Sequence, residues 1–127
     1  EFSRLLSMLK DSYSKGISDS QIITELVNID VLAIDELGKG RVTEWEMTII
    51  DEIISRRYNA MKTIIGTSNY LWKVASGAPT PNLALNAFNQ TLGDRVGMRT
   101  FSRLQEMSVS FELKGTDFRG FGKQFLS

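Results

Sequence analysis

The first third of the chain shows two kinds of hydrophobic pattern. Residues 2–14 carry apolar side chains three or four positions apart, and a second run of this kind begins after Gly16, near Ser18 or Asp19. Both runs predict amphipathic helices. Residues 31–34 form an unbroken apolar run that stops at two acids. This run predicts a short strand that is buried on both faces, as in a parallel sheet.

A long helix and a second strand follow the first strand. Thr43 and Glu46 have the spacing of a capping box and predict a helix over residues 44–60. Residues 62–67 read KTIIGT and predict the second strand. Because a strand, a helix and a strand at crossover spacing form a parallel unit, the predicted fold class is α/β.

The second half of the chain contains one clear loop and several predicted elements. Residues 76–81 read SGAPTP, hold both prolines and predict a loop. Helices are expected over residues 82–91 and 94–106. The alternation in SVSFELK, residues 108–114, predicts a half-buried strand, and a loop is expected after Gly115.

Composition narrows the chemistry that the chain can perform. The 127 residues suffice for one domain, and a formal net charge of zero gives no overall field toward nucleic acid or membranes. Without cysteine or histidine, disulfides, thiol nucleophiles, the usual zinc sites and histidine-based triads are excluded. The sequence lacks the ~20-residue apolar stretch that spans a bilayer, and its first residues lack the features of a secretory signal. A cytoplasmic protein without a membrane partner is therefore expected.

Polar side chains follow both predicted strands at the point where each strand ends. Ligands of parallel sheets lie beyond the carboxyl ends of the strands, which predicts one shared rim for four residues: Asp35, Glu36, Ser68 and Asn69. An acid there can hold a magnesium ion, the next acid can act as general base toward water, and an amide can hold that water. We assign these roles to Asp35, Glu36 and Asn69. Taken alone, solvation of a strand end explains the acids equally well, and a turn explains Ser-Asn.

The segments AIDELG, SRRY and TIIGTSN together resemble the DnaC/DnaI helicase-loader and IstB-like branch of the AAA+ ATPases. The resemblance covers residues 2–119. It implies a P-loop NTPase core with three α-β-α layers, of which residues 1–127 form one partial domain that uses ATP and Mg²⁺. In this family the first segment is the Walker B segment and the third is sensor 1. The resemblance thus places Asp35, Ser68 and Asn69 at the nucleotide.

Two arginines gain roles from the same resemblance. Residues 99–104 resemble the box VII helix, which implies that Arg103 is the arginine finger that reaches the nucleotide of a neighbouring subunit. Arg119 resembles the sensor 2 arginine. A guanidinium suits both tasks because it stabilises the negative charge on phosphoryl oxygens during hydrolysis. Arg95 and Arg99 would share one helical face with Arg103; we expect Arg95 to be solvated and Arg99 to meet solvent, a partner or DNA.

The phosphate-binding motif G-x-x-x-x-G-K-[ST] does not occur in the sequence. In the resembling family this loop lies upstream of the segment that matches here. The chain is therefore expected to be the C-terminal part of a longer core, with the Walker A segment missing, and to bind ATP poorly alone. A degenerate protein that never bound nucleotide is the alternative.

The function that the resemblance implies is ATP-dependent helicase loading. Such a protein assembles as a homo-oligomeric ring or spiral, with Arg103 acting in trans, and places a replicative DNA helicase on single-stranded DNA. Lys39 and Arg41, in a loop with two glycines, are candidate DNA contacts, although a solvated loop explains them equally well. An IstB-like transposase helper ATPase and a non-hydrolysing interaction domain with a P-loop-like fold are the alternatives.

Overall fold

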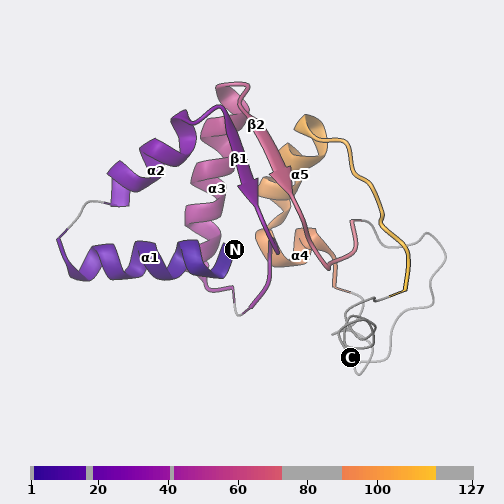
Figure 1. Ribbon diagram of the computed structural model, residues 1–127, viewed down its shortest axis with the longest axis horizontal. Helices are drawn as coiled ribbons and strands as arrows, with labels where there is room; N and C mark the ends of the chain where they lie inside the picture. Colours follow the sequence, from indigo (N-terminus) through magenta and orange to yellow (C-terminus); the bar gives the residue numbers. More distant parts are fainter. Residues whose placement is uncertain (1, 17–18, 41, 73–89, 117–127) are drawn as a thin grey trace, which may run out of the picture.

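The computed structural model describes residues 2–16, 19–40, 42–72 and 90–116. In these ranges the elements are, in chain order, α1 (Phe2–Ser14), α2 (Asp19–Asn28), β1 (Val31–Ile34), α3 (Glu44–Asn59), β2 (Thr63–Gly66), α4 (Leu92–Val96) and α5 (Met98–Met107) (Figure 1). The three helices and two strands predicted for the first half of the chain are confirmed. None of the described helices is long and apolar enough to cross a membrane.

β1 and β2 form a two-stranded parallel sheet, and α3 lies in the connection between them. Val31 pairs with Thr63 and Ile34 pairs with Gly66, so the two strands start and end together. Figure 1 shows both arrows pointing the same way, with α3 and α5 beside them. The predicted α/β class is therefore confirmed.

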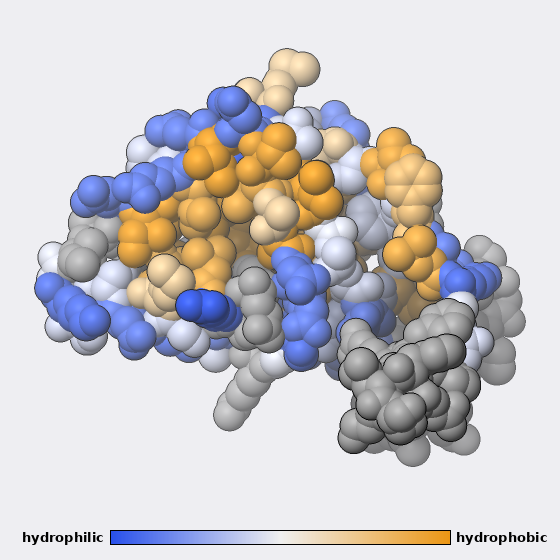
Figure 2. All heavy atoms as spheres, viewed as in Figure 1, coloured by the Kyte–Doolittle hydropathy of each residue, from blue (hydrophilic) through white to orange (hydrophobic). Residues whose placement is uncertain are grey.

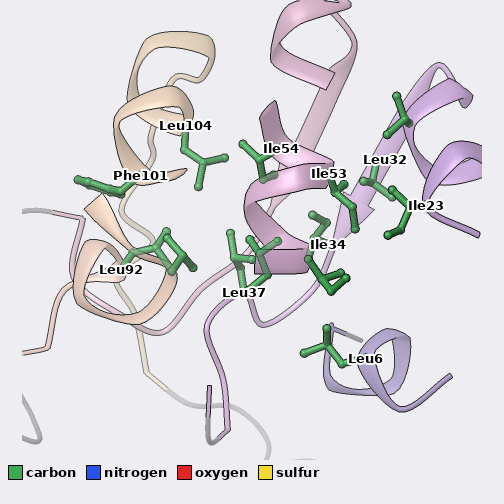
Figure 3. Packing of buried hydrophobic residues seen from close by; sticks show 14 of the residues in the cluster. Leu6, Ile23, Leu32, Ile34, Leu37, Ile53, Ile54, Leu92, Phe101 and Leu104 are labelled. Carbon is green, nitrogen blue, oxygen red and sulfur yellow. The ribbon is translucent and has the colours of Figure 1, made fainter. Parts of the chain in front are cut away.

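The two faces of this sheet differ in what covers them. Leu32 and Ile34 are 6% exposed and belong to a core to which every described helix contributes apolar side chains (Figure 3). Val31 and Ile65, on the opposite face, are 52% and 57% exposed, and Figure 2 shows an apolar surface over this part of the molecule. The prediction of strands buried on both faces is wrong for the described residues, because their helices cover one face only. Of three α-β-α layers, the described residues form the sheet and one helical layer.

The amino end of α3 has the capping box that the sequence predicts. The Glu46 N–H donates to the Thr43 hydroxyl at 3.3 Å, and the Thr43 N–H donates to Glu46 Oε2 at 2.7 Å. The Glu46 carboxylate also lies 3.2 Å from the Lys10 ammonium of α1. Burial acts to raise the pKa of Glu46, but hydrogen bonds from the Thr43 backbone and from Lys10 outweigh it and leave this pKa lowered. The box fixes the start of α3 and its contact with α1.

Arg57, near the carboxyl end of α3, closes the amino end of the sheet. It is fully buried, at 0% exposure. Its guanidinium donates to five backbone carbonyls at 2.6–3.1 Å, those of Leu26, Val27, Ile29, Asp30 and Thr63. Burial lowers the pKa of Arg57, and the charge of Asp30 partly opposes that shift. One side chain thereby joins the end of α2, the turn before β1 and the start of β2.

Two short helices, α4 and α5, replace the single helix expected over residues 94–106. Thr91 and Asp94 form a second capping box, which starts α4. Gly97 follows with a φ of 90°, a conformation that favours glycine, and α5 begins at the next residue. The continuous helix was therefore a wrong prediction. The helix expected over residues 82–91 lies outside the described residues except for its last two positions, which are not helical.

The strand expected over residues 108–114 does not form. Its alternation places Val109, Phe111 and Leu113 at every second position, but these side chains are 79%, 82% and 95% exposed. A half-buried strand needs a neighbouring strand and a covered face, and the described residues supply neither to this segment. The proline loop at 76–81 lies outside the part of the chain that the structure describes, as does the chain beyond residue 116.

Candidate functional site

The carboxyl ends of β1 and β2 lie side by side. Ile34 and Gly66 end the two strands as register partners, so Asp35 follows one strand where Thr67 follows the other. The pairing continues past the strands, because the Thr67 N–H donates to the Ile34 carbonyl at 3.0 Å and the Leu37 N–H donates to the Thr67 carbonyl at 2.8 Å. The predicted acids and polar residues therefore follow the same edge of the sheet.

Thr67 connects the two acids of this edge. Its hydroxyl donates to Asp35 Oδ1 at 2.5 Å and accepts from the Glu36 N–H at 2.9 Å. One side chain after β2 therefore orients the carboxylate of Asp35 and the backbone of Glu36. Thr67 was not among the residues predicted for the site. Thr67 directly follows the second strand, at the same level as Asp35 after the first. Aligning the two predicted strands in register would have revealed this residue.

Glu36 has an uncommon backbone conformation and a close cationic partner. Its φ is 57°, in the left-handed region, which costs a non-glycine residue about 1–2 kcal/mol. The Lys39 ammonium donates to both Glu36 carboxylate oxygens at 2.6 Å, and the Lys39 N–H donates to the Glu36 carbonyl at 3.1 Å. The predicted general base and one predicted DNA contact thus form an ion pair. Arg41, the other predicted DNA contact, lies outside the described residues.

Ser68 and Asn69 follow Thr67 and differ in what their side chains do. The Ser68 hydroxyl donates to the Leu37 carbonyl at 2.9 Å and accepts from the Tyr70 N–H at 3.2 Å. It therefore braces the turn after β1 against the segment after β2. Asn69 is exposed, and its side chain makes no hydrogen bond to the described residues. Contacts with the described residues therefore leave available the amide that was predicted to hold water.

Arg95 of α4 holds the loop that follows the acidic pair. Its Nε donates to the Gly38 carbonyl at 2.9 Å, and its Nη2 donates to the Gly40 carbonyl. The guanidinium also lies 5.0 Å from the centre of the Tyr70 ring. The expectation that Arg95 is solvated is wrong, because these loop carbonyls are acceptors that the sequence does not reveal. At Gly38 an added Cβ would lie 3.0 Å from the Arg95 Cβ, so the close approach requires glycine.

Arg99 and Arg103 of α5 face α3 instead of the loop. Arg103 Nη1 lies 3.5 Å from Asp51 Oδ1, and Arg99 Nε lies 3.7 Å from Asp51 Oδ2. The Arg103 side chain is 24% exposed and that of Arg99 is 74% exposed. The expected single stripe of three arginines is therefore divided, because Gly97 ends the first helix between Arg95 and Arg99. Arg119, the predicted sensor 2 residue, lies outside the described residues.

Proteins similar to this chain include helicase loaders and an uncharacterized relative. No family model matches the chain. The replicative helicase loader DnaC of Escherichia coli K12 is 34% identical over 59 residues, which are 46% of this chain and 24% of DnaC. The uncharacterized protein YdaV of the same strain is 33% identical over 76 residues, 49% of this chain and 31% of YdaV. A crystal structure of the DnaC helicase loader matches with a TM-score of 0.63 and 28% identity, over 86% of this chain and 56% of that one. The chain thus resembles the DnaC helicase loader in sequence and in fold.

The DnaC-like chain spans less than a third of the curated relatives it matches and about half of the solved DnaC chain. The sequence similarity and the structural similarity point to the same kind of protein. The partial P-loop NTPase core predicted from the sequence is thereby confirmed.

The oxygen donors of the DnaC-like chain suit a magnesium ion that nucleotide phosphates help to hold. The described residues contain no group of three or more acidic, histidine or cysteine side chains that could form an all-protein metal cage. Mg²⁺ is usually bound by one or two carboxylates together with substrate phosphates and water. Asp35 provides one exposed carboxylate at the rim, oriented by Thr67 through Oδ1. This donor set fits the magnesium role predicted for Asp35.

Proposed function

We propose that this chain is part of an ATP-dependent helicase loader and that the residues at the carboxyl edge of its sheet catalyse ATP hydrolysis. The observation that carries the proposal is the arrangement of Asp35, Thr67 and Glu36 at the carboxyl edge of a parallel sheet. It occurs in a chain that is similar to replicative helicase loaders in sequence and in fold. Catalysis by such an edge depends on position and charge, since phosphoryl transfer leaves little covalent chemistry to the protein.

Each residue of the edge has a separate task in this proposal. Asp35 holds Mg²⁺, which when bound neutralises charge on the nucleotide phosphates. Glu36 accepts the proton of the attacking water, and Asn69 holds that water by its free amide. Ser68 keeps the segment after β2 close to the turn after β1 through its bond to the Leu37 carbonyl. The geometry supports these tasks because both acids and the amide follow one edge.

Arginines complete the nucleotide site in the proposed assembly. Arg103 acts on the nucleotide of a neighbouring subunit in a homo-oligomer, and Arg119 acts as sensor 2. The position of Arg103 supports action in trans, because its guanidinium lies beside Asp51 of α3 and not at the edge of its own sheet. An arginine supplied in trans contributes about 10³–10⁵ in rate to other nucleotide hydrolases.

Binding of ATP also needs a phosphate-binding loop. The 127 residues contain no P-loop motif, so the proposal places that loop in a part of the protein outside this sequence. We therefore expect the 127-residue chain to bind ATP weakly and the full-length protein to bind it well. Equally tight binding of ATP by both would contradict this placement.

The proposed client is a replicative helicase, which the protein places on single-stranded DNA. Two observations favour this client over a transposase: the similar curated protein and the similar solved structure are both helicase loaders. The loop with Lys39 supports a contact with the DNA backbone, since its side chain is 52% exposed at the edge of the site.

A substitution of Glu36 tests the proposed function. Glu36→Gln in the full-length protein should lower ATP turnover about 10²–10⁴-fold, the usual contribution of a general base, with helicase and single-stranded DNA present. Glu52→Gln is the matched control, because Glu52 pairs with Arg56 on the exposed side of α3. Turnover that is unchanged in Glu36→Gln, or absent in the wild type, would sink the proposal.

A further inference from the structure

The carboxylate of Asp51 lies between α3 and α5, and hydroxyl groups from both helices fix it. The hydroxyl of Thr100, a residue that is 2% exposed, donates to Asp51 Oδ1 at 3.0 Å, and the Ser55 hydroxyl donates to the same oxygen at 3.4 Å. The reaction proposed above gives this carboxylate no task. Its orientation is therefore set by the packing of α3 on α5 (Figure 1).

Arg103 contacts this fixed carboxylate through one of its three guanidinium nitrogens. Its Nη1 lies 3.5 Å from Asp51 Oδ1 and donates to the Arg99 carbonyl at 3.4 Å. Its Nε and Nη2 make no hydrogen bond to the described residues, and the side chain is 24% exposed. A guanidinium frequently binds a carboxylate with two nitrogens, each at about 2.7–2.9 Å. The longer, one-sided contact with Asp51 restricts Arg103 without occupying the donors that a phosphate would use.

The charges around Asp51 do not balance. Arg99 Nε lies 3.7 Å from Asp51 Oδ2, so one carboxylate faces two guanidinium groups. The three side chains together carry a net positive charge and attract an anion. A carboxylate that kept Arg103 from other anions would neutralise it and bind two of its nitrogens. The observed contact instead restricts a side chain that has about 2 kcal/mol of rotamer entropy to lose.

We propose that Asp51 is a positioning residue for Arg103 and keeps its guanidinium ready for the nucleotide phosphates of a neighbouring subunit. This inference rests on the action in trans that is proposed above for Arg103. Asp51 acts through Arg103 and does not itself touch the nucleotide. Because part of the ordering of Arg103 is complete before two subunits meet, less entropy is lost when the guanidinium meets the phosphates.

A conservative substitution tests the charge of Asp51. Asp51→Asn in the full-length protein keeps an oxygen that accepts from the Thr100 and Ser55 hydroxyls. The kcat for ATP, with helicase and single-stranded DNA present, should fall about two- to fivefold, the range for a partly exposed ion pair. The KM for ATP should change by less than about twofold, because the arginine acts on the transition state. Asp51→Glu keeps the charge and should retain most of the turnover.

Mixed oligomers show in which subunit Asp51 acts. Glu36→Gln subunits supply Arg103 but do not hydrolyse ATP, and Arg103→Ala subunits keep Glu36 but supply no arginine. Each kind should have little turnover alone, and mixing should restore it. Adding Asp51→Asn to the Glu36→Gln subunits should lower the restored turnover about two- to fivefold. Adding it to the Arg103→Ala subunits should leave the restored turnover unchanged.

The subunits that supply Arg103 also offer a matched control. Glu52→Gln removes a negative charge from α3 at the next position, but Glu52 pairs with Arg56 and not with Arg103. It should leave the restored turnover unchanged. Equal losses from Asp51→Asn in both kinds of subunit would show a structural role and overturn the inference. A rise in turnover would overturn it as well, because Asp51 would then restrain Arg103.

Failure of the proposed function looks different from failure of this inference. Turnover by Glu36→Gln subunits alone would contradict the general base, and mixing that restores nothing would contradict an arginine in trans. Both results appear with Asp51 unaltered. The inference fails by itself when mixing restores turnover and Asp51→Asn has no effect in the subunits that supply Arg103.

Discussion

At the amino end of the sheet, one buried guanidinium binds five backbone carbonyls; at the carboxyl end, short and partly exposed side chains bind one another. Arg57 is 0% exposed and takes its acceptors from α2, from the turn before β1 and from β2. Thr67 and Asp35 are exposed, and Glu36 has a left-handed backbone. The first end depends on backbone atoms, which are the same for any side chain. The second depends on side chains that a ligand can reach and rearrange.

The difference has a simple energetic origin. A buried charge is stable only when hydrogen bonds replace the water it has lost, so Arg57 must keep nearly all of its partners. Exposed acids can bind water when they lose a protein partner, so replacing that partner by a ligand costs little free energy. The carboxyl end, where partners can be exchanged, therefore suits the nucleotide site that we propose there.

The largest expected effect is on the amino end. Arg57→Lys should lower the free energy of unfolding by about 2–5 kcal/mol, because an ammonium has three donors and leaves at least two of the five carbonyls without their present donor. Urea unfolding of the same protein with Arg56→Lys is the control. Arg56 lies next to Arg57 and makes one exposed pair with Glu52 at 3.4 Å, so its replacement should change stability by less than about 0.5 kcal/mol. Equal losses in the two variants would contradict the contrast between the ends.

Thr67→Val tests the centre of the carboxyl end. Removing the hydroxyl breaks its bonds to Asp35 and to the Glu36 N–H and should cost about 1–2 kcal/mol of stability. ATP turnover of the full-length protein should fall as well, because both acids lose their common support. Thr67→Ser keeps the hydroxyl and should retain most of both properties. Turnover of Thr67→Val at the wild-type level would remove Thr67 from the site.

Glu46 allows a test by pH at the start of α3. Its pKa in the folded protein is lowered from 4.5, so its carboxylate stabilises the fold above about pH 4.5, and this contribution disappears as the pH falls through the folded pKa. Glu46→Gln keeps an oxygen for the capping box but loses the charge that pairs with Lys10. Near pH 7 it should be about 1 kcal/mol less stable than the wild type. In urea unfolding the difference should shrink as the pH falls below about 4.5 and through the folded pKa; a difference that does not change with pH would exclude the charge as its cause.

The smallest stability change is expected at Asn69. Asn69→Ala removes an exposed side chain that bonds to no described residue, so the free energy of unfolding should change by less than about 0.5 kcal/mol. ATP turnover of the full-length protein should nevertheless fall about 10²-fold, because a misplaced water reacts slowly. Asn59→Ala, at the exposed end of α3, should leave turnover unchanged. A large loss of stability without a loss of turnover would show that Asn69 supports the fold and does not hold the attacking water.

Local patterns predicted the first half of the chain well. The apolar run at 31–34, the capping box of Thr43 and Glu46 and the second apolar run predicted both strands, the helix between them and their parallel order. These features are determined within a few residues of the chain. The shared edge of Asp35 and Asn69 follows directly, because parallel strands in register end together.

Features that depend on distant partners could not be predicted in this way. The five acceptors of Arg57 come from three segments, and the acceptors of Arg95 lie more than fifty residues away in the chain. The ion pair of Glu36 and Lys39 is close in sequence but depends on the left-handed backbone of Glu36. The strand expected over 108–114 does not form because a strand also needs a distant partner. Its residues alternate as a strand requires, but the described residues include no neighbouring strand for it.

Gly97 divides three evenly spaced arginines, Arg95, Arg99 and Arg103, between two different binding partners. Arg95, before this glycine, is fastened to the loop that carries Lys39, whereas Arg99 and Arg103, after it, are fastened to α3 through Asp51. Without the glycine a single rigid rod would carry all three, and any shift of α5 would pull directly on the loop. Gly97 therefore separates the attachment of the loop beside Glu36, which Arg95 makes, from the attachment of α5 to α3.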